Sequence, residues 1–132
     1  MSNTRFFAFD LLATLVAVVR FDGNIIFANS ELEDALGTSQ RLLMGEDLSD
    51  YLTDPAVLLN ALKGVGDNEV GALRFDAWLK RTNRDVLPVH VIVSQTGDPN
   101  ELVVELLPIE QQSRQEREER LLDQSQANKE LI

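Results

Sequence analysis

The sequence predicts an α+β domain, in which a five-stranded antiparallel sheet carries short helices on one face. Residues 72–80 alternate between apolar and polar side chains with the period of two that a strand requires. Residues 38–63 instead space their leucines as short helices do. Two strands are expected before these helices and three after them, and all the connections allow antiparallel pairing.

The first two strands are predicted to form a hairpin that leads into a helix. Asp22-Gly23 tolerates the positive φ angles of a two-residue hairpin turn, and apolar residues flank it on both sides. Ser30 and Glu33 then fit a capping box, and Gly37 can end the helix that this box begins. We expect this helix to cross one face of the sheet.

The later elements follow from turn residues and from alternation. Asp54-Pro55 is a plausible cap and first position for a helix that ends near Gly64. Residues 82–85 and 97–100 read as turns, which leaves strands at 86–95 and 102–107. The predicted sheet therefore ends in a meander of three strands.

Alternation also predicts which side chains face the helices. This inner set is almost wholly apolar: Leu15, Ala17, Val19, Phe27, Leu36, Leu43, Leu52, Phe75, Val89, Val91 and Val104. Without convergent polar groups to orient a ligand, such a set favours a packed core over a small-molecule pocket.

The opposite, outer face of the sheet is predicted to be apolar as well. It would carry Val16, Val18, Trp78, Ile92 and Val103. Leaving such a patch in water would forgo on the order of 10 kcal/mol, so we expect something to cover it. Trp78 is an interface candidate, because a tryptophan on an exposed face is more often a binding anchor than a bystander.

Both ends of the chain are predicted to lie outside this sheet. Residues 1–12, with Phe6, Phe7 and Phe9, would form a helical cap that docks on the outer face of its own or of a second chain. Residues 109–132 lack Gly and Pro and predict a helix about 35 Å long. Its spacing suggests a weak paired-helix seam formed by Leu121, Ser125, Asn128 and Ile132. We expect the stronger part of this helix pair to continue beyond the chain.

Composition narrows the function. The chain of 132 residues is one domain's worth, and its net charge of −10 disfavours binding to nucleic acid or to an anionic membrane. It has no cysteine and one histidine, which excludes thiolate chemistry and multi-histidine metal sites and disfavours an enzyme. No apolar run reaches the roughly twenty residues of a membrane span, and no secretory signal is evident, so a cytoplasmic protein is expected.

His90, the only histidine, has two interpretations. It could be catalytic or a haem ligand, or it could be a strand residue on the outer sheet face. We favour the second interpretation, because alternation along residues 86–95 places His90 on the outer side of its strand. We therefore expect no cofactor and no metal.

Several short motifs resemble those of the PAS family. Phe27-Ala28-Asn29, Leu36-Gly37 and Leu43-Met44-Gly45 fit its aromatic-x-Asn, Leu-Gly and hydrophobic-x-Gly positions, although Glu31 stands where alanine is common. The segment Leu106-Leu107-Pro108-Ile109 and the Gln-rich tail that follows resemble, more specifically, the nitrogen-regulation sensor histidine kinase NtrB (NRII, GlnL) family. The resemblance implies a PAS domain over residues 13–108 between an N-terminal helical cap and a C-terminal signalling helix.

The resemblance also implies a function. The chain would be a non-catalytic sensory and dimerisation module that passes a conformational bias along residues 109–132 to a kinase core absent from this chain. The parent protein would be an ATP-dependent protein-histidine kinase that controls the response regulator NtrC under the PII protein. The alternative is a PAS receptor domain of another signalling protein with an internal small-molecule pocket.

Overall fold

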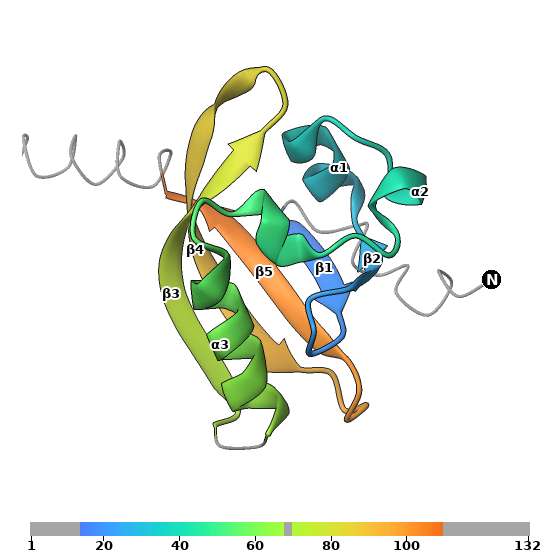
Figure 1. The fold of residues 1–132 in the computed structure, drawn as a ribbon, viewed down its shortest axis with the longest axis vertical. Coiled ribbons are helices and arrows are strands. Elements are labelled where there is room, and N and C mark those ends of the chain that lie inside the picture. Colours follow the sequence, from blue (N-terminus) through green and yellow to red (C-terminus); the bar gives the residue numbers. More distant parts are fainter. Residues whose placement is uncertain (1–13, 68–69, 110–132) are drawn as a thin grey trace, which may run out of the picture.

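The computed structural model describes residues 14–67 and 70–109, which form one sheet with its helices on one side (Figure 1). The strand order is β2-β1-β5-β4-β3, and every neighbouring pair is antiparallel. The predicted α+β architecture with five strands is therefore confirmed. The strands are β1 (Leu15–Val19), β2 (Ile25–Ala28), β3 (Ala72–Arg81), β4 (Arg84–Gln95) and β5 (Leu102–Pro108).

The four helices of the described residues lie between β2 and β3 in the sequence, where short helices were predicted. They are α1 (Ser30–Leu36), α2 (Gln40–Leu43), the 3₁₀ helix η2 (Leu48–Tyr51) and α3 (Pro55–Gly66). Proline at the first position of α3 and Asp54 before it confirm the predicted start of that helix. The helix ends two residues later than expected, because Gly64 continues it.

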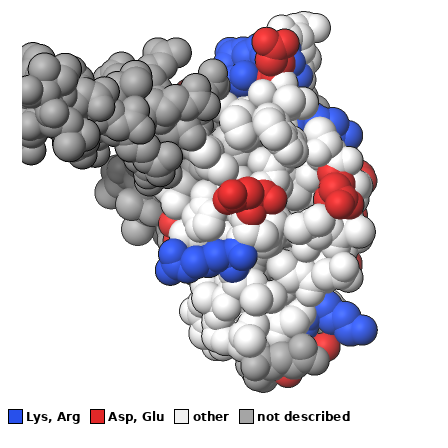
Figure 2. Space-filling view, turned by 90° about the vertical axis from the view of Figure 1, so that its left-hand side faces the viewer, with Lys and Arg blue, Asp and Glu red and all other residues white. Residues whose placement is uncertain are grey.

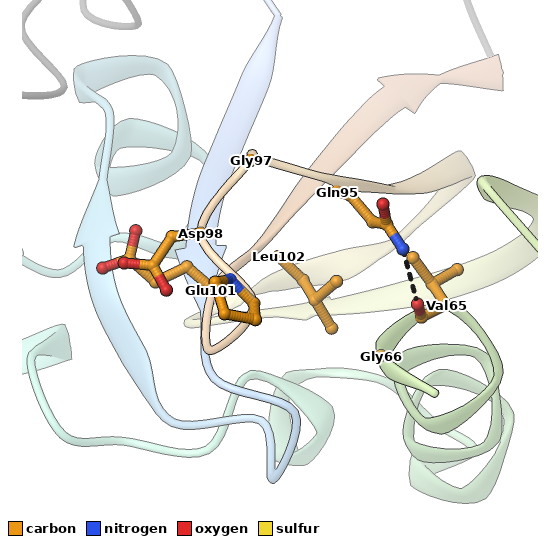
Figure 3. A pocket seen from close by; sticks show the side chains of 8 residues that line it. Val65, Gly66, Gln95, Gly97, Asp98, Glu101 and Leu102 are labelled. Atoms are coloured by element: carbon orange, nitrogen blue, oxygen red, sulfur yellow. Dashed lines mark hydrogen bonds between the residues drawn. The ribbon is translucent and has the colours of Figure 1, made fainter. Parts of the chain in front are cut away.

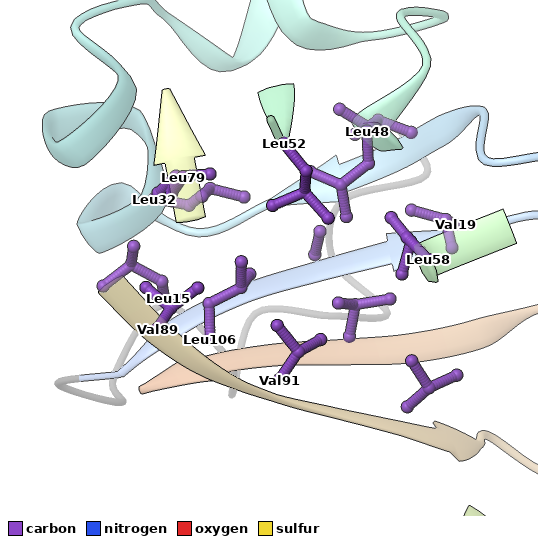
Figure 4. Packing of buried hydrophobic residues seen from close by; sticks show 14 of the residues in the cluster. Leu15, Val19, Leu32, Leu48, Leu52, Leu58, Leu79, Val89, Val91 and Leu106 are labelled. Carbon is purple, nitrogen blue, oxygen red and sulfur yellow. The ribbon is translucent and has the colours of Figure 1, made fainter. Parts of the chain in front are cut away.

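The core lies between the helices and the sheet (Figure 4). Leu32, Leu48, Leu52 and Leu58 point from the helical layer toward the sheet and lie against valines and leucines of β1, β4 and β5. Each of the four leucines is at most 1% exposed. The predicted packed core is thus present, with Phe75 packed at its margin.

The turn between β1 and β2 differs from the predicted two-residue turn. Arg20 and Asn24 pair across a three-residue loop, in which the Gly23 N–H donates to the Arg20 carbonyl at 2.9 Å. Only Gly23 takes a positive φ, 95°, whereas Asp22 does not. A tight turn followed by a left-handed glycine is the usual three-residue hairpin, so the Asp-Gly signal located the hairpin and misjudged its loop length.

The cap of α1 also differs from the prediction. Asn29, and not Ser30, is the N-cap, because the Asn29 Oδ1 accepts the Leu32 N–H at 3.0 Å. The same oxygen accepts the Val16 N–H at 3.0 Å, and the Asn29 Nδ2 donates to the Thr14 carbonyl at 2.7 Å. Asn29 therefore joins α1 to β1. Gly37 ends the helix in the left-handed conformation with φ 73°, as predicted.

One residue of the predicted inner set lies on the other face. Phe27 pairs with Val18, and these two form a separate small cluster with Ile26. The pairing of β1 with β2 shifts between Val18 and Val19, so strict alternation across the hairpin fails at this point. The prediction for Phe27 was therefore wrong, whereas Ala17 and Val19 face the core as expected.

The expected N-terminal cap over residues 1–12 and the C-terminal helix lie outside the described residues, apart from Ile109. Within the part of the chain that the structure describes, every helix is too short or too polar to cross a membrane.

Candidate functional site: the outer face of the sheet

The strand register arranges the outer face in rows that run across the sheet. At one end, Ser94, Val103, Val18 and Phe27 lie side by side on β4, β5, β1 and β2. The next row contains Arg74, Ile92, Glu105 and Val16. Then come the row of Asp76, His90 and Leu107 and the pair of Trp78 with Pro88. The face thus changes from apolar at β1 to mixed at β3.

Trp78 and Ile92, the two predicted interface residues within the described part of the chain, both lie on this face. Trp78 is 53% exposed near the C-terminal end of β3, and Ile92 is half-buried in β4. They are not direct neighbours, because the row of Asp76 and His90 separates them. Trp78 and Ile92 therefore mark two ends of one surface about 13 Å long.

The Asp76–His90 pair is the polar feature of this surface that the sequence did not predict. The His90 Nδ1 lies 2.8 Å from the Asp76 Oδ1, with the two side chains 32% and 72% exposed. Both residues fall on the outer face by alternation, so their strand pairing was the missing information. The pair places His90 on the outer sheet face, as we favoured, and fixes the orientation of its ring.

The other half of the outer face is closed. Val16, Val18 and Phe27 have no exposed area, and Val103 is 8% exposed. Alternation placed Val16, Val18 and Trp78 in one apolar patch, yet of these three residues only Trp78 is exposed. The accessible surface is therefore confined to β3, β4 and the adjacent part of β5.

A separate hollow lies at the far end of α3, outside the core (Figure 3). It has a volume of about 160 Å³ and is lined by Val65 and Gly66 of α3, Gln95 of β4 and the loop that leads to Leu102. The Gln95 amide donates to the Val65 carbonyl at 3.1 Å and closes one wall. An adjoining hollow of about 320 Å³ lies beside the β1–β2 turn and shares Asp98 and Glu101 with the first.

Two side chains near the helical layer have shifted pKa values. The backbone N–H of Asn24, followed by its side-chain amide, lowers the pKa of Asp22 in the β1–β2 turn. Burial, followed by the charges of Glu46 and Asp50, raises the pKa of Tyr51 above its ordinary value near 10. Neither shift lies on the outer face.

The remaining predicted site residues lie outside the described residues: Phe6, Phe7, Phe9, Leu121, Ser125, Asn128 and Ile132. Within residues 14–67 and 70–109, no group of three or more His, Asp or Glu side chains is placed to hold a metal ion. The surface described above can contribute a tryptophan anchor, apolar contacts and a polar pair, which are the components of an interface.

Comparison with known proteins agrees with this fold. The family model described as the PAS fold matches residues 5–109. The chain belongs to the PAS family. No curated protein matches the sequence.

Solved PAS domains share the fold at low sequence identity. The PAS domain of an HTR-like protein from Haloarcula marismortui has a TM-score of 0.66 and 18% identity, and the match covers 81% of this chain and 91% of that one. A domain of a sensory box sensor histidine kinase/response regulator from Geobacter sulfurreducens has a TM-score of 0.66 and 16% identity, with coverages of 80% and 92%.

A third similar structure contains a ligand. The PAS domain of the RpfR quorum-sensing receptor from Cronobacter turicensis, in complex with BDSF, has a TM-score of 0.64 and 16% identity, with coverages of 74% and 95%.

The structure explains the asparagine of the PAS motif in the present chain. Asn29 caps α1 and binds the backbone of β1 at the same time.

Proposed function

We propose that this PAS domain is a non-catalytic signalling module that dimerises through the open half of its outer sheet face. One observation carries the proposal: Trp78 is 53% exposed on a sheet face whose other half is closed. Half-buried Ile92 and Leu107 extend the same surface toward the middle of the sheet. A second copy would remove these side chains from water, and tryptophan is among the strongest interface anchors.

The proposed output is the helix of residues 109–132. The last strand, β5, ends at Pro108 and pairs with β1 and β4, so a change at the outer face would be transmitted directly to the start of that helix. In the proposal, the helix pairs with its copy through Leu121, Ser125, Asn128 and Ile132. The small and polar members of this seam would keep two arrangements of the pair close in energy.

The proposed parent is a cytoplasmic sensor histidine kinase of the NtrB type, with NtrC and the PII protein as partners. The support comes from the residues of the last strand and of the Gln-rich tail that resemble this family. The sensor histidine kinase domain from Geobacter sulfurreducens has the same fold, which is consistent with the proposal. The domain limits proposed are 1–12, 13–108 and 109–132.

A ligand-binding receptor domain is the second candidate. The BDSF complex of the RpfR domain shows that a similar fold has been solved with a small molecule. In the present chain, however, the leucines and valines between helices and sheet are almost fully buried against one another. Native mass spectrometry of protein purified from cells separates the two functions, because a stoichiometric extra mass would contradict the empty relay module.

Sedimentation of the full chain tests dimerisation through the outer face. We expect Trp78→Ala to weaken self-association by at least about tenfold, because the substitution removes the exposed tryptophan anchor. Leu42→Ala is the matched control, since Leu42 is 67% exposed on α2, on the helical side of the sheet. Equal association of both variants would contradict the proposal.

The relay can be tested in the parent protein. Replacing Ser125 and Asn128 together by leucine should make the helix seam apolar and hold the pair in one arrangement. The balance between kinase and phosphatase activity should then shift toward one extreme. An unchanged balance would count against a relay through this helix.

A further inference from the structure

Strand β3 forms an edge of the sheet, and most of that edge is open among the described residues. Among the strands that the structure describes, β3 pairs with β4 alone. On its other side, a contact occurs at one end, where Leu52 bridges to Leu79 and the Thr53 N–H donates to the Trp78 carbonyl at 3.0 Å. The edge from Ala72 to Ala77 therefore presents backbone groups to which a further strand could bind.

The position of Thr53 shows which backbone groups point outward. Because the Trp78 carbonyl is directed at Thr53, the N–H and C=O groups of Trp78 point away from β4. Residues two and four positions earlier, Asp76 and Arg74, share this direction, since backbone groups alternate along a strand. Asp76 and Arg74 would thus be hydrogen-bonded positions for an added strand.

The inner side of the same edge leaves apolar side chains partly open. Leu73, Phe75 and Ala77 face the core but remain partly exposed. Their direct partners on β4 are Val93, Val91 and Val89, and each of these valines is 0% exposed. The difference arises because β4 has a neighbour on both sides and β3 has one.

We propose that β3 of a second copy of this chain pairs antiparallel with this edge, about a two-fold axis at Phe75. In this register, Arg74 of each copy lies opposite Asp76 of the other, and Phe75 lies opposite Phe75. Leu73 meets Ala77 of the second copy, so the partly exposed apolar strip covers itself. Two opposite-charge pairs form at once, because the symmetry repeats each contact.

The charges select this register over its neighbours. Moving the axis by one residue to Arg74 brings the two Arg74 side chains opposite each other, and moving it to Asp76 does the same for the two carboxylates. Like charges directly opposite destabilise a strand pair, and opposite charges stabilise it. Among these three axes, only the one at Phe75 pairs unlike charges at both positions.

The flank of the molecule that carries the β3 edge is largely uncharged (Figure 2). Figure 2 shows the flank on which β3 lies in Figure 1, and its charged side chains are scattered over largely uncharged surface. Asp76 also binds His90 on the outer face, so the proposed pairing extends the row of Leu107, His90 and Asp76 by an arginine. This contact lies beyond the proposed function, because it joins the backbone edges of two β3 strands, whereas the proposed function joins two outer faces.

Charge reversal tests the register. We expect Arg74→Asp and Asp76→Arg each to weaken self-association of the full chain by at least about tenfold in sedimentation, since each creates like-charge pairs. The double variant Arg74→Asp/Asp76→Arg should restore it. Arg84→Asp, which changes an exposed charge at the far end of β4, is the control and should have no effect. If the double variant did not restore association, the proposed pairing of β3 with β3 of a second copy would be wrong.

Disulfide trapping tests the same register directly, because the chain has no cysteine of its own. Directly opposite residues of a hydrogen-bonded pair have Cα atoms about 5.5 Å apart, within the range of a disulfide. An oxidised mixture of Arg74→Cys and Asp76→Cys should give the cross-linked dimer, and a mixture of Lys80→Cys and Asp76→Cys should not. Equal cross-linking in both mixtures would overturn the register.

The variant Ile92→Asp distinguishes the β3-edge contact from the outer-face dimer of the proposed function. Ile92 lies on β4, on the outer face beside Arg74, and contributes no backbone group to the β3 edge. Reduced association in Ile92→Asp together with normal cross-linking between Arg74→Cys and Asp76→Cys would support both contacts. Normal association in Trp78→Ala and Ile92→Asp together with loss in Arg74→Asp would support the edge and contradict the outer-face dimer.

Discussion

The outer face of the sheet has two halves that differ in solvent exposure. The same alternation of side chains along the strands predicted both halves to be apolar. Near β1, Val16, Val18 and Phe27 are fully buried. Near β3, Trp78 is 53% exposed and Asp76 binds His90 in contact with solvent. Apolar side chains alone therefore do not define an accessible surface. The half that combines an exposed tryptophan with a polar pair is the one suited to reversible association.

The largest expected effect comes from placing the same charge in each half. Val18→Asp should lower the free energy of unfolding by about 4 kcal/mol or more, because an unpaired carboxylate would be buried. Ile92→Asp should cost about 1 kcal/mol or less, since Ile92 is half-buried and lies beside Arg74. Urea unfolding of the two variants measures the difference. If the two variants lost similar free energies of unfolding, the two halves of the outer face would not differ in burial as described.

The closed half should also depend on Asn29. Asn29→Ala should destabilise the fold by about 3 kcal/mol, because it removes the cap of α1 and leaves the buried Val16 N–H without its acceptor. Ser30→Ala is the matched control and should cost at least about 1 kcal/mol less in the same urea experiment. If Ser30→Ala were instead the more destabilising substitution, Ser30 and not Asn29 would be the cap of α1.

Gly23→Ala should have a smaller effect at the turn that joins β1 to β2. A Cβ at Gly23 would overlap the carboxylate of Asp47, which caps η2 through the Ser49 N–H, and the φ of 95° is unfavourable for alanine. We expect a loss of about 2–3 kcal/mol. Gly97→Ala shares the positive φ but meets no neighbouring atom within 4 Å, so the difference between the two variants isolates the overlap.

The smallest expected effect is on the pKa of Tyr51. This residue lies outside the outer face, so its titration should not depend on either half. Its raised pKa favours the neutral phenol in the folded state, so its contribution to stability is complete below pH 10 and is lost as pH rises through the folded pKa. Tyr51 is the only tyrosine, and its absorbance titration should therefore show a midpoint above 10 that returns to about 10 in denaturant. A midpoint at 10 in the folded protein would contradict the assigned burial.

The sequence predicted the features that depend on local periodicity. Alternation placed Trp78 and Ile92 on one face, and Gly37 correctly ended α1. It also placed Val16 and Val18 on that face but carried no information on which half would be closed, since burial depends on the packing of distant segments.

Features that depend on register between strands were not predictable in the same way. The turn at Thr82-Asn83 alone would place Asp76 opposite Val89, but an irregularity between Leu79 and Arg81 shifts the pairing to His90. A similar shift beside Val18 moved Phe27 to the outer face. One extra residue in a strand moves all the following side chains to the opposite face of the sheet. No local sequence signal marked either of these two positions.

The central claim, that the β3 half of the outer face is an association surface, is tested most directly by the fluorescence of Trp78, the only tryptophan. In a concentration series of the full chain, its emission should shift to shorter wavelength and become protected from a soluble quencher as copies associate. Ile92→Asp should keep the exposed emission at the same concentrations. Emission that stays exposed while sedimentation shows dimers would contradict the claim.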